Sequence, residues 1–373
     1  MLSLRVSQRG PGPIGPVIGP PERGVGGRWV GVSVAGAAEC VIMRILVTGG
    51  AGFIGSTFTR QLLADRYPGL EGADVTVLDK LTYAGNLANL EPVEDSDRYT
   101  FVQGDICDPE VVRELVAQTD AVVHFAAESH VDRSILGGAD FVMTNVMGTQ
   151  TLLQAALDTK LTKFVHVSTD EVYGSIESGS WDENEPLLPN SPYSASKAGS
   201  DLLARAYART HNLPVTITRC SNNYGPYQFP EKVIPLFVTN LMDGATVPLY
   251  GEGRNVRDWL HVDDHCRGIA LVLAGGRAGE IYNIGGGTEL TNAELTAKLI
   301  EATGRDESFI ERIVDPRGGG HDLRYSVNHG KISRELGYQP RVPFDQGLAD
   351  TITWYRENRD WWEPLKARSA IDR

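Results

Sequence analysis

Two short stretches of the sequence carry side chains that can move protons. Residues 168–171 read Ser-Thr-Asp-Glu and follow an apolar run, and Tyr193 lies four residues before Lys197. Residues four apart share one face of a helix, and a nearby ammonium favours the charged form of a phenol. Tyr193 is therefore predicted to act as a base on an alcohol. The two adjacent carboxylates would add acid and base chemistry that a simple dehydrogenase does not need.

The elements that position these residues are expected to be alternating strands and helices. The apolar run 164–167 is typical of a buried parallel strand, which places Thr169, Asp170 and Glu171 at its carboxyl end, where open α/β sheets bind ligands. Helices are expected up to about Asp65, from Pro109, over 145–159 and around Tyr193. The other expected strands cover residues 44–48, 74–79, 99–103, 121–125, 215–219 and 281–284. This alternation predicts an α/β fold with a doubly wound parallel Rossmann sheet.

A glycine-rich turn lies where this fold binds dinucleotides. Gly49, Gly52 and Gly55 are spaced three apart, follow the first strand and open a helix, which allows a tight turn and a close approach to pyrophosphate. Asp79 ends the second strand, where a carboxylate can bind the adenosine ribose and disfavour a 2′-phosphate. The pattern therefore predicts NAD in preference to NADP, and Lys80 works against that preference.

Composition excludes several classes of protein. The chain has 373 residues, of which 41% are hydrophobic, and a formal charge of 35 − 48 = −13, which disfavours nucleic acid and anionic membranes as main partners. No apolar run is long enough to span a membrane. The four cysteines are scattered and form no CxxC pair, which indicates a reduced, cytoplasmic setting without a disulfide framework or a metal site.

The chain is expected to have three parts. Residues 1–42 contain nine Gly and five Pro and are predicted to be a disordered extension, not a signal peptide, with Met43 as a possible natural start. Residues 43–220, with returning segments at about 261–285, are predicted to form the NAD-binding Rossmann domain. Residues 221–260 and 286–373 are predicted to form mainly a smaller substrate-binding lobe over the carboxyl edge of the sheet.

The combination of Thr169, Tyr193 and Lys197 resembles the extended short-chain dehydrogenase/reductase family. In that family the Ser/Thr hydroxyl binds O4 of the sugar, Tyr is the base and Lys holds the nicotinamide ribose. Sugar epimerases of the family usually carry small residues at the positions of Asp170 and Glu171, whereas nucleotide-sugar 4,6-dehydratases carry acids. Segments 79–86, 124–134, 219–232 and 255–264 also look like the dehydratases, and the resemblance covers residues 43 to about 366.

The resemblance implies a hydro-lyase (a lyase) that uses NAD and acts on dTDP-glucose in deoxysugar biosynthesis. The expected reaction is C4 oxidation, loss of water across C5 and C6, and hydride return to C6, giving dTDP-4-dehydro-6-deoxy-glucose. Glu171 would remove the C5 proton and Asp170 would protonate the departing C6 hydroxyl. Three alternatives stay open: a 4,6-dehydratase of another nucleotide sugar, an epimerase or decarboxylase, and a non-catalytic NAD-binding regulator. The family's pattern also implies a homodimer packed through helices around 141–158 and 193–211.

The resemblance further implies two sets of binding residues. The expected cofactor-binding residues are Gly49, Gly52, Phe53, Ile54, Gly55, Asp79, Lys80, Leu81, Thr82, Asp105, Ile106, Phe125, Ala126, Ala127, Ser129, Thr144, Tyr193, Lys197 and Asn223. The expected substrate-binding residues are Ser129, Thr169, Asn222, Lys232, Val233, Pro248, Tyr250, Arg257, Asn292, Arg317 and His321. The loop 315–321 departs from the family's pattern because it is richer in glycine and is expected to be one residue longer.

Overall fold

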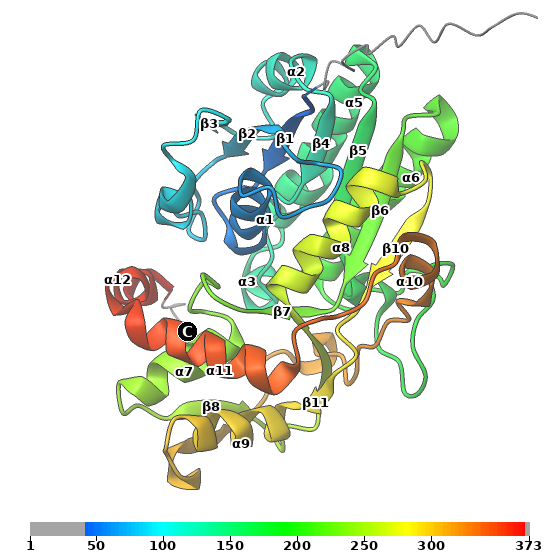
Figure 1. The fold of residues 1–373 in the computed structure, drawn as a ribbon. Coiled ribbons are helices and arrows are strands. Elements are labelled where there is room, and N and C mark those ends of the chain that lie inside the picture. Colours follow the sequence, from blue (N-terminus) through cyan, green and yellow to red (C-terminus); the bar gives the residue numbers. More distant parts are fainter. Residues whose placement is uncertain (1–41, 370–373) are drawn as a thin grey trace, which may run out of the picture. The chain divides into compact units, whose positions relative to one another are not determined.

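The computed structural model describes residues 42–369, so almost all of the predicted disordered extension, with Cys40, lies outside the described residues. A seven-stranded parallel sheet with strand order β10-β6-β5-β4-β1-β2-β3 forms the centre of the fold (Figure 1). Its strands are β1 Arg44–Thr48, β2 Asp74–Asp79, β3 Tyr99–Gln103, β4 Ala121–His124, β5 Lys163–Thr169, β6 Val215–Cys220 and β10 Ile281–Ile284. The predicted doubly wound α/β class is confirmed.

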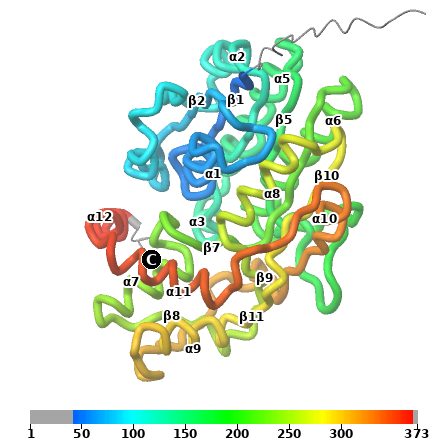
Figure 2. The backbone as a smooth tube through the Cα atoms, viewed as in Figure 1, coloured from blue at the N-terminus to red at the C-terminus, as the bar shows by residue number. Residues whose placement is uncertain are grey.

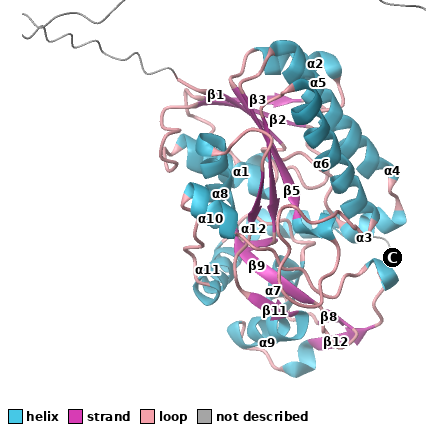
Figure 3. Ribbon diagram, turned by 90° about the vertical axis from the view of Figure 1, so that its right-hand side faces the viewer, coloured by secondary structure: helices cyan, strands magenta, loops and turns pink. Residues whose placement is uncertain are grey.

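Helices cover both faces of this sheet (Figure 3). One layer contains α1 and α8, and the other contains α2, α5 and α6; their bounds are α1 Phe53–Leu63, α8 Val262–Gly275, α2 Pro109–Ala117, α5 Thr149–Thr159 and α6 Pro192–His211. Alternation along β1 explains the two layers, because Ile45 and Val47 pack into the core beside α1 and α8, whereas Leu46 packs beside α2 and α5. All three side chains are fully buried.

The predicted helix over 145–159 begins earlier and is irregular. It starts with α4 Ala139–Phe141 and continues through the π-helical segment η3 Val142–Gly148 into α5. The short helix α3 Val131–Leu136 precedes it, and the 3₁₀ turns η1 Leu87–Asn89 and η2 Glu91–Val93 follow β2. Strand and helix ends otherwise differ from the predicted bounds by one or two residues.

A smaller lobe of short strands and helices follows β6. It contains a three-stranded sheet, β11-β9-β7, and a two-stranded sheet, β12-β8. The strands are β7 Asn222–Tyr224, β8 Val247–Tyr250, β9 Val256–His261, β11 Glu289–Thr291 and β12 Ile310–Ile313. The helices are α7 Val233–Met242, α9 Asn292–Ala302, α11 Phe344–Glu357 and α12 Arg359–Ser369, and the 3₁₀ turns of the lobe are η5 Glu307–Phe309 and η6 Gly318–Gly320. A further 3₁₀ turn, η4 Asp170–Tyr173, directly follows β5 in the sheet part.

The lobe has its own core, to which α7, α9, α11 and the fully buried Trp362 of α12 contribute. Figure 2 shows how the backbones of these helices are arranged. The helix α10 Gly330–Leu336 is an exception within the C-terminal part, because Ile332 packs into the sheet core beside α8 and β10. None of the helices in residues 42–369 combines the length and the hydropathy needed to cross a membrane.

Candidate active site

The carboxyl ends of the parallel strands open into two cavities that share lining residues. The sheet cavity, of about 710 Å³, extends from the glycine-rich turn to Tyr193 and Lys197. The lobe cavity, of about 480 Å³, extends from Glu171 into the lobe as far as Asn292. The residues that line both cavities are Ser129, Glu171, Asn222, Asn223, Gln228, Glu231 and Lys232. The predicted catalytic segment therefore lies where the two cavities meet.

Almost every predicted binding residue lines the cavity expected for it. Of the predicted cofactor residues only Leu81 is not part of the sheet-cavity wall, and its amide instead donates to Asp79 Oδ1 at 2.8 Å. Of the predicted substrate residues only Thr169 lines the sheet cavity rather than the lobe cavity. Arg317 and His321, which belong to the unusual glycine-rich loop, both line the lobe cavity.

The glycine-rich turn is shaped for an anionic group. Gly52, the residue before helix α1, provides no side-chain cap, and the first turn contains no acidic residue, which leaves first-turn amides available for an anion. A Cβ atom at Gly55 would lie 2.3 Å from the carbonyl oxygen of Gly49, so only glycine fits there. Asp79 braces the turn, because its Oδ2 accepts a hydrogen bond from the Ala51 amide at 2.9 Å.

Asp79 and Lys80 at the end of β2 are both engaged within the protein. Burial raises the pKa of Asp79, while the backbone amides of Leu81 and Ala51 oppose that shift. The Lys80 ammonium lies 2.6 Å from Asp105 Oδ2 at the end of β3. The positive charge of Lys80, which was expected to count against NAD, is therefore partly neutralised by Asp105.

Tyr193 and Lys197 lie on α6, whose first turn is fixed by a reciprocal pair of hydrogen bonds between Ser191 and Ser194. Lys197 Nζ donates to the carbonyl oxygen of Val167 at 2.8 Å, and burial lowers the pKa of Lys197 to about 8. Burial, with the charge of Glu171, raises the pKa of Tyr193 well above its ordinary value. The prediction that Lys197 helps the phenol to ionise stays a prediction, because burial and Glu171 set the direction of this pKa shift.

The two carboxylates differ in their surroundings. Asp170 is 2% exposed, its Oδ1 accepts from the Thr169 hydroxyl at 3.3 Å, and its Oδ2 has no partner within residues 42–369. Burial and the neighbouring Glu171 raise the pKa of Asp170 well above its usual range. Burial also raises the pKa of Glu171, but Arg257 and Lys232 oppose that shift. Asp170 is thus suited to donate a proton and Glu171 to accept one.

Positive side chains of the lobe cavity are held by neighbouring groups. Arg257 donates to the carbonyl oxygen of Asp322 at 3.0 Å, and its guanidinium lies 4.4 Å from the centroid of the Tyr325 ring. Arg317 pairs with Asp132 of α3 at 2.6 Å, and Lys232 donates to the carbonyl oxygen of Ser129 at 2.7 Å. These contacts collect cationic groups in one cavity of an acidic protein, as an anionic ligand requires.

Sequence reasoning missed several residues of the site. Asp132, Glu231 and Tyr325 line the lobe cavity, and Glu231 pairs with Arg133 at 3.1 Å. Asp132 and Glu231 lie within the segments 124–134 and 219–232, whose resemblance to the dehydratases could have identified them. No sequence pattern pointed to Tyr325, because its position depends on the fold of the lobe.

The doubly wound sheet, the glycine-rich turn and the Tyr193–Lys197 pair define an extended short-chain dehydrogenase/reductase. The sequence model of the family described as GDP-mannose 4,6 dehydratase matches residues 46–351, and the chain belongs to this family.

Similar proteins point further. The dTDP-glucose 4,6-dehydratase of Streptomyces niveus is 61% identical over 325 residues, covering 87% of this chain and 96% of that protein. The Escherichia coli protein of the same name is 46% identical over 352 residues, covering 87% and 96%. The crystal structure of the dTDP-glucose 4,6-dehydratase DesIV from Streptomyces venezuelae, with NAD and TYD bound, has a TM-score of 0.85 and 67% identity, covering 87% of this chain and 100% of that chain. A Thermotoga maritima UDP-glucose 4-epimerase structure is 31% identical, with a TM-score of 0.76, covering 85% and 100%.

Proposed function

We propose that this chain is an NAD-dependent hydro-lyase that converts dTDP-glucose to dTDP-4-dehydro-6-deoxy-glucose and water. One observation carries the proposal: Asp170 and Glu171 lie together where the two cavities meet, and both cavities reach the catalytic strand end. An epimerase needs no such acid pair. The high identity to dTDP-glucose 4,6-dehydratases over most of the chain supports the choice of reaction and of nucleotide.

The sheet cavity fits NAD, which is bound in the structure of the Streptomyces venezuelae relative. The uncapped amino terminus of α1 suits its pyrophosphate, and Asp79 stands where the adenosine ribose would lie. Lys197 would hold the nicotinamide ribose. When bound, the nicotinamide takes a hydride from C4 of the sugar and later returns it to C6, so that the reaction is redox-neutral overall.

The proton steps fall to the chain's own residues. Tyr193 takes the O4 proton while the Thr169 hydroxyl holds that oxygen, a step that requires the phenolate form of Tyr193. The resulting ketone acidifies the C5 proton, which Glu171 removes. Asp170 keeps a proton because burial raises its pKa, and it gives that proton to the departing C6 hydroxyl, which leaves as water. When the hydride returns to C6, a proton is replaced at C5.

The lobe cavity supplies the nucleotide site. Arg257, Arg317 and Lys232 place positive charge where a diphosphate would lie, and Asn222 Oδ1 is a buried acceptor without a partner in the described part of the chain. Val233, Pro248 and Tyr250 provide apolar surface for the base and the sugar of the nucleotide.

We also propose that the protein is a cytoplasmic homodimer. Among the described residues Cys107, Cys220 and Cys266 are free thiols, as a reducing compartment allows. Exposed apolar side chains occur on α3, η3 and α6, namely Leu136, Val142, Met143, Met147 and Leu202. These exposed side chains support helix packing against a second copy. Light scattering that gives the mass of a monomer at micromolar concentration would contradict the dimer.

The test of the proposed reaction is incubation of the purified protein with dTDP-glucose, UDP-glucose and GDP-mannose in parallel, with product analysis by mass spectrometry and NMR. We expect loss of water and a 4-keto-6-deoxy sugar from dTDP-glucose in preference to the others. Dehydration of UDP-glucose or GDP-mannose instead would replace the substrate assignment, and a C4 epimer as the product would replace the reaction. No product from any of the three, with NAD added, would favour the regulator.

A further inference from the structure

Asn89 connects the glycine-rich turn to the C-terminal helix of the lobe. The side chain is 2% exposed and lies at the end of η1. Its Nδ2 donates to the carbonyl oxygen of Ala51, within the glycine-rich turn, at 2.9 Å. Its Oδ1 accepts from Trp361 Nε1 of α12 at 3.0 Å. One buried amide thus joins two segments that are more than 250 residues apart in the chain.

Ala51 is itself a central point of the turn. Its amide donates to Asp79 Oδ2 at 2.9 Å, and its carbonyl oxygen also accepts from the Asn86 amide at 3.1 Å. Asn89 therefore binds the residue, Ala51, that also holds the Asp79 carboxylate in place. Ala51 directly precedes Gly52 and the start of α1, so Asn89 also helps to position the amino terminus of that helix. A displacement of Asn89 would loosen both.

The lobe side of the contact is rigid. The indole of Trp362, next to Trp361, is fully buried, and its Nε1 donates to the Tyr355 carbonyl oxygen at 2.7 Å, which anchors α12 on α11. Trp361 also packs with Trp354 at 5.0 Å between ring centroids and with Tyr227 at 5.7 Å. The Arg60 guanidinium of α1 covers the other side of the contact, 4.0 Å from the Tyr227 centroid, and Arg60 also donates to the Asn89 carbonyl oxygen.

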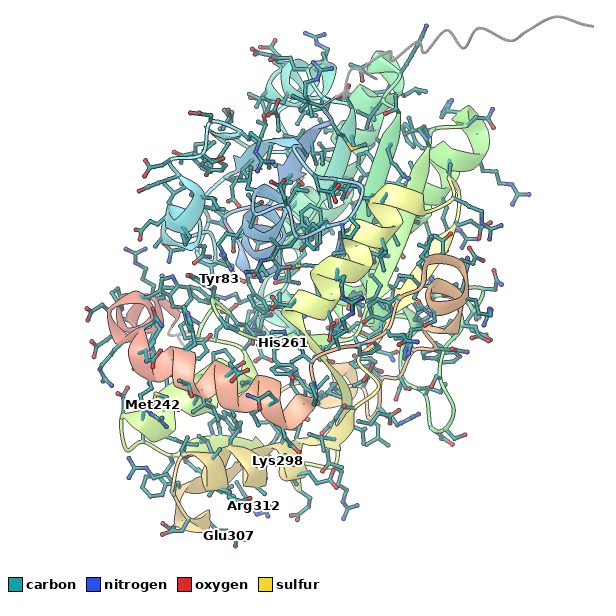
Figure 4. All side chains as sticks on the ribbon, in the orientation of Figure 1. Tyr83, Met242, His261, Lys298, Glu307 and Arg312 are labelled. Carbon is teal, nitrogen blue, oxygen red and sulfur yellow. The ribbon has the colours of Figure 1, made fainter. Side chains whose placement is uncertain are left out.

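The neighbouring loop is tied to the lobe as well. Tyr83 packs edge-on against Phe229 at 5.6 Å between centroids, and Arg133 lies over the Tyr83 ring at 4.1 Å. Figure 4 shows Tyr83 between the sheet layers and the C-terminal helices. The segment from Tyr83 to Asn89, which follows the ribose-binding strand, is thus fastened to the lobe at both ends.

We propose that the Trp361–Asn89 hydrogen bond is a latch through which α12 keeps the glycine-rich turn closed on NAD and slows its release. The proposal rests on the proposed cofactor. Because the proposed reaction is redox-neutral, NAD is restored in every cycle and does not have to be exchanged. A contact that slows the release of NAD therefore keeps the enzyme in its NAD-bound, active form. Trp361 and Asn89 are positioning residues, because neither lines the sheet cavity.

The test compares NAD release from three holoenzymes: the unchanged protein, Trp361→Phe and Trp354→Phe. Each is diluted into NAD-free buffer, and retained NAD is measured over time after rapid gel filtration. Trp361→Phe keeps an aromatic ring but loses the donor, and we expect it to release NAD about two- to tenfold faster, the range of one net hydrogen bond. Trp354→Phe changes the same aromatic cluster without touching Asn89, so its release rate should stay near that of the unchanged protein.

A second variant and a stability measurement separate the latch from general packing. Asn89→Ser shortens the acceptor and leaves Trp361 intact, so it should release NAD faster, and adding Trp361→Phe to it should cause little further change. Thermal unfolding of the NAD-free proteins reports packing alone. Equal retention in Trp361→Phe and the unchanged protein, or equal losses in both Trp variants, would overturn the latch. If even the unchanged protein fails to bind added NAD, the cofactor assignment itself falls, and the latch with it.

Discussion

The sheet cavity and the lobe cavity meet at Glu171 but are built in different ways. The walls of the sheet cavity come largely from strand ends and from the turn at Gly49–Gly55, where backbone atoms and close packing define the shape. The lobe cavity depends on charged side chains from α3, β9 and the loop 315–321, each held by a partner such as Asp132 or Tyr325. The cofactor site is therefore a property of the backbone fold, and the substrate site a property of individual side chains.

This difference predicts different responses to mutation. A change in the glycine-rich turn should disturb the whole sheet cavity, because backbone atoms cannot move aside. A change of one cation in the lobe should weaken substrate binding and leave the chemistry intact. The changes below test this contrast from the largest expected effect to the smallest.

Gly55→Ala should remove nearly all activity. The new Cβ would lie 2.3 Å from the Gly49 carbonyl oxygen and 2.9 Å from Gly50 Cα, so the turn must shift and lose NAD. NAD content of the purified protein, measured after denaturation, and turnover with added NAD check this. Gly137→Ala, where an added Cβ meets nothing within 4 Å, is the control and should retain both. A Gly55→Ala enzyme with full NAD content would show that the turn is not the cofactor site.

Asp170→Asn should lower kcat by about 10²- to 10⁴-fold, the usual contribution of a positioned general acid. The amide cannot protonate the departing hydroxyl, while the binding cavities remain. KM for dTDP-glucose should change little in steady-state kinetics. Asp182→Asn, at an exposed aspartate, is the matched control. Wild-type kcat in Asp170→Asn would remove Asp170 from the mechanism.

Arg317→Gln should raise KM for dTDP-glucose by about tenfold or more with a small change in kcat, because it removes a charge-assisted contact to the diphosphate. Arg312→Gln is a suitable control, since Arg312 is more than half exposed and lies at the end of the lobe remote from the sheet (Figure 4). A kcat effect without a KM effect would move Arg317 from binding to chemistry.

The contribution of the buried His124 and His166 to stability should decline as the pH falls from about 7 to about 5, a small effect that opposes the one expected from buried carboxyl groups such as Asp170. Burial lowers the pKa of His124 and of His166, so the folded protein keeps both neutral while the unfolded chain binds protons below its ordinary pKa near 6.5. Proton uptake on unfolding means that the stability present above that pH is lost on acidification. A His124→Asn variant should lose less stability on acidification than the unchanged protein, and an equally steep pH dependence of the two urea unfolding midpoints would contradict the prediction.

Much of the sheet domain was predictable, because its strands are short apolar runs between turn signals and the ends of the predicted strands lie within two residues of the observed ones. The adjacent acids Asp170 and Glu171 and the pair Tyr193 and Lys197 were also predictable, because the members of each pair are close together in the sequence. The Asp132–Arg317 pair and the Asn89–Trp361 contact were not, because each joins residues more than 180 apart in the chain. The raised pKa of Tyr193 was not predicted either, because it depends on burial and on the charge of Glu171, which appear only in the fold.

The most direct test of the account is the reaction of Glu171→Gln with dTDP-glucose in D₂O, followed by nicotinamide absorbance and by NMR of the sugar. The unchanged enzyme should give a 4-keto-6-deoxy product with deuterium at C5. Glu171→Gln should still oxidise C4, so reduced nicotinamide accumulates, while C5 exchange and dehydration become slow. Normal turnover with full deuterium incorporation at C5 in Glu171→Gln would contradict the central claim that the carboxylate where the two cavities meet removes the C5 proton.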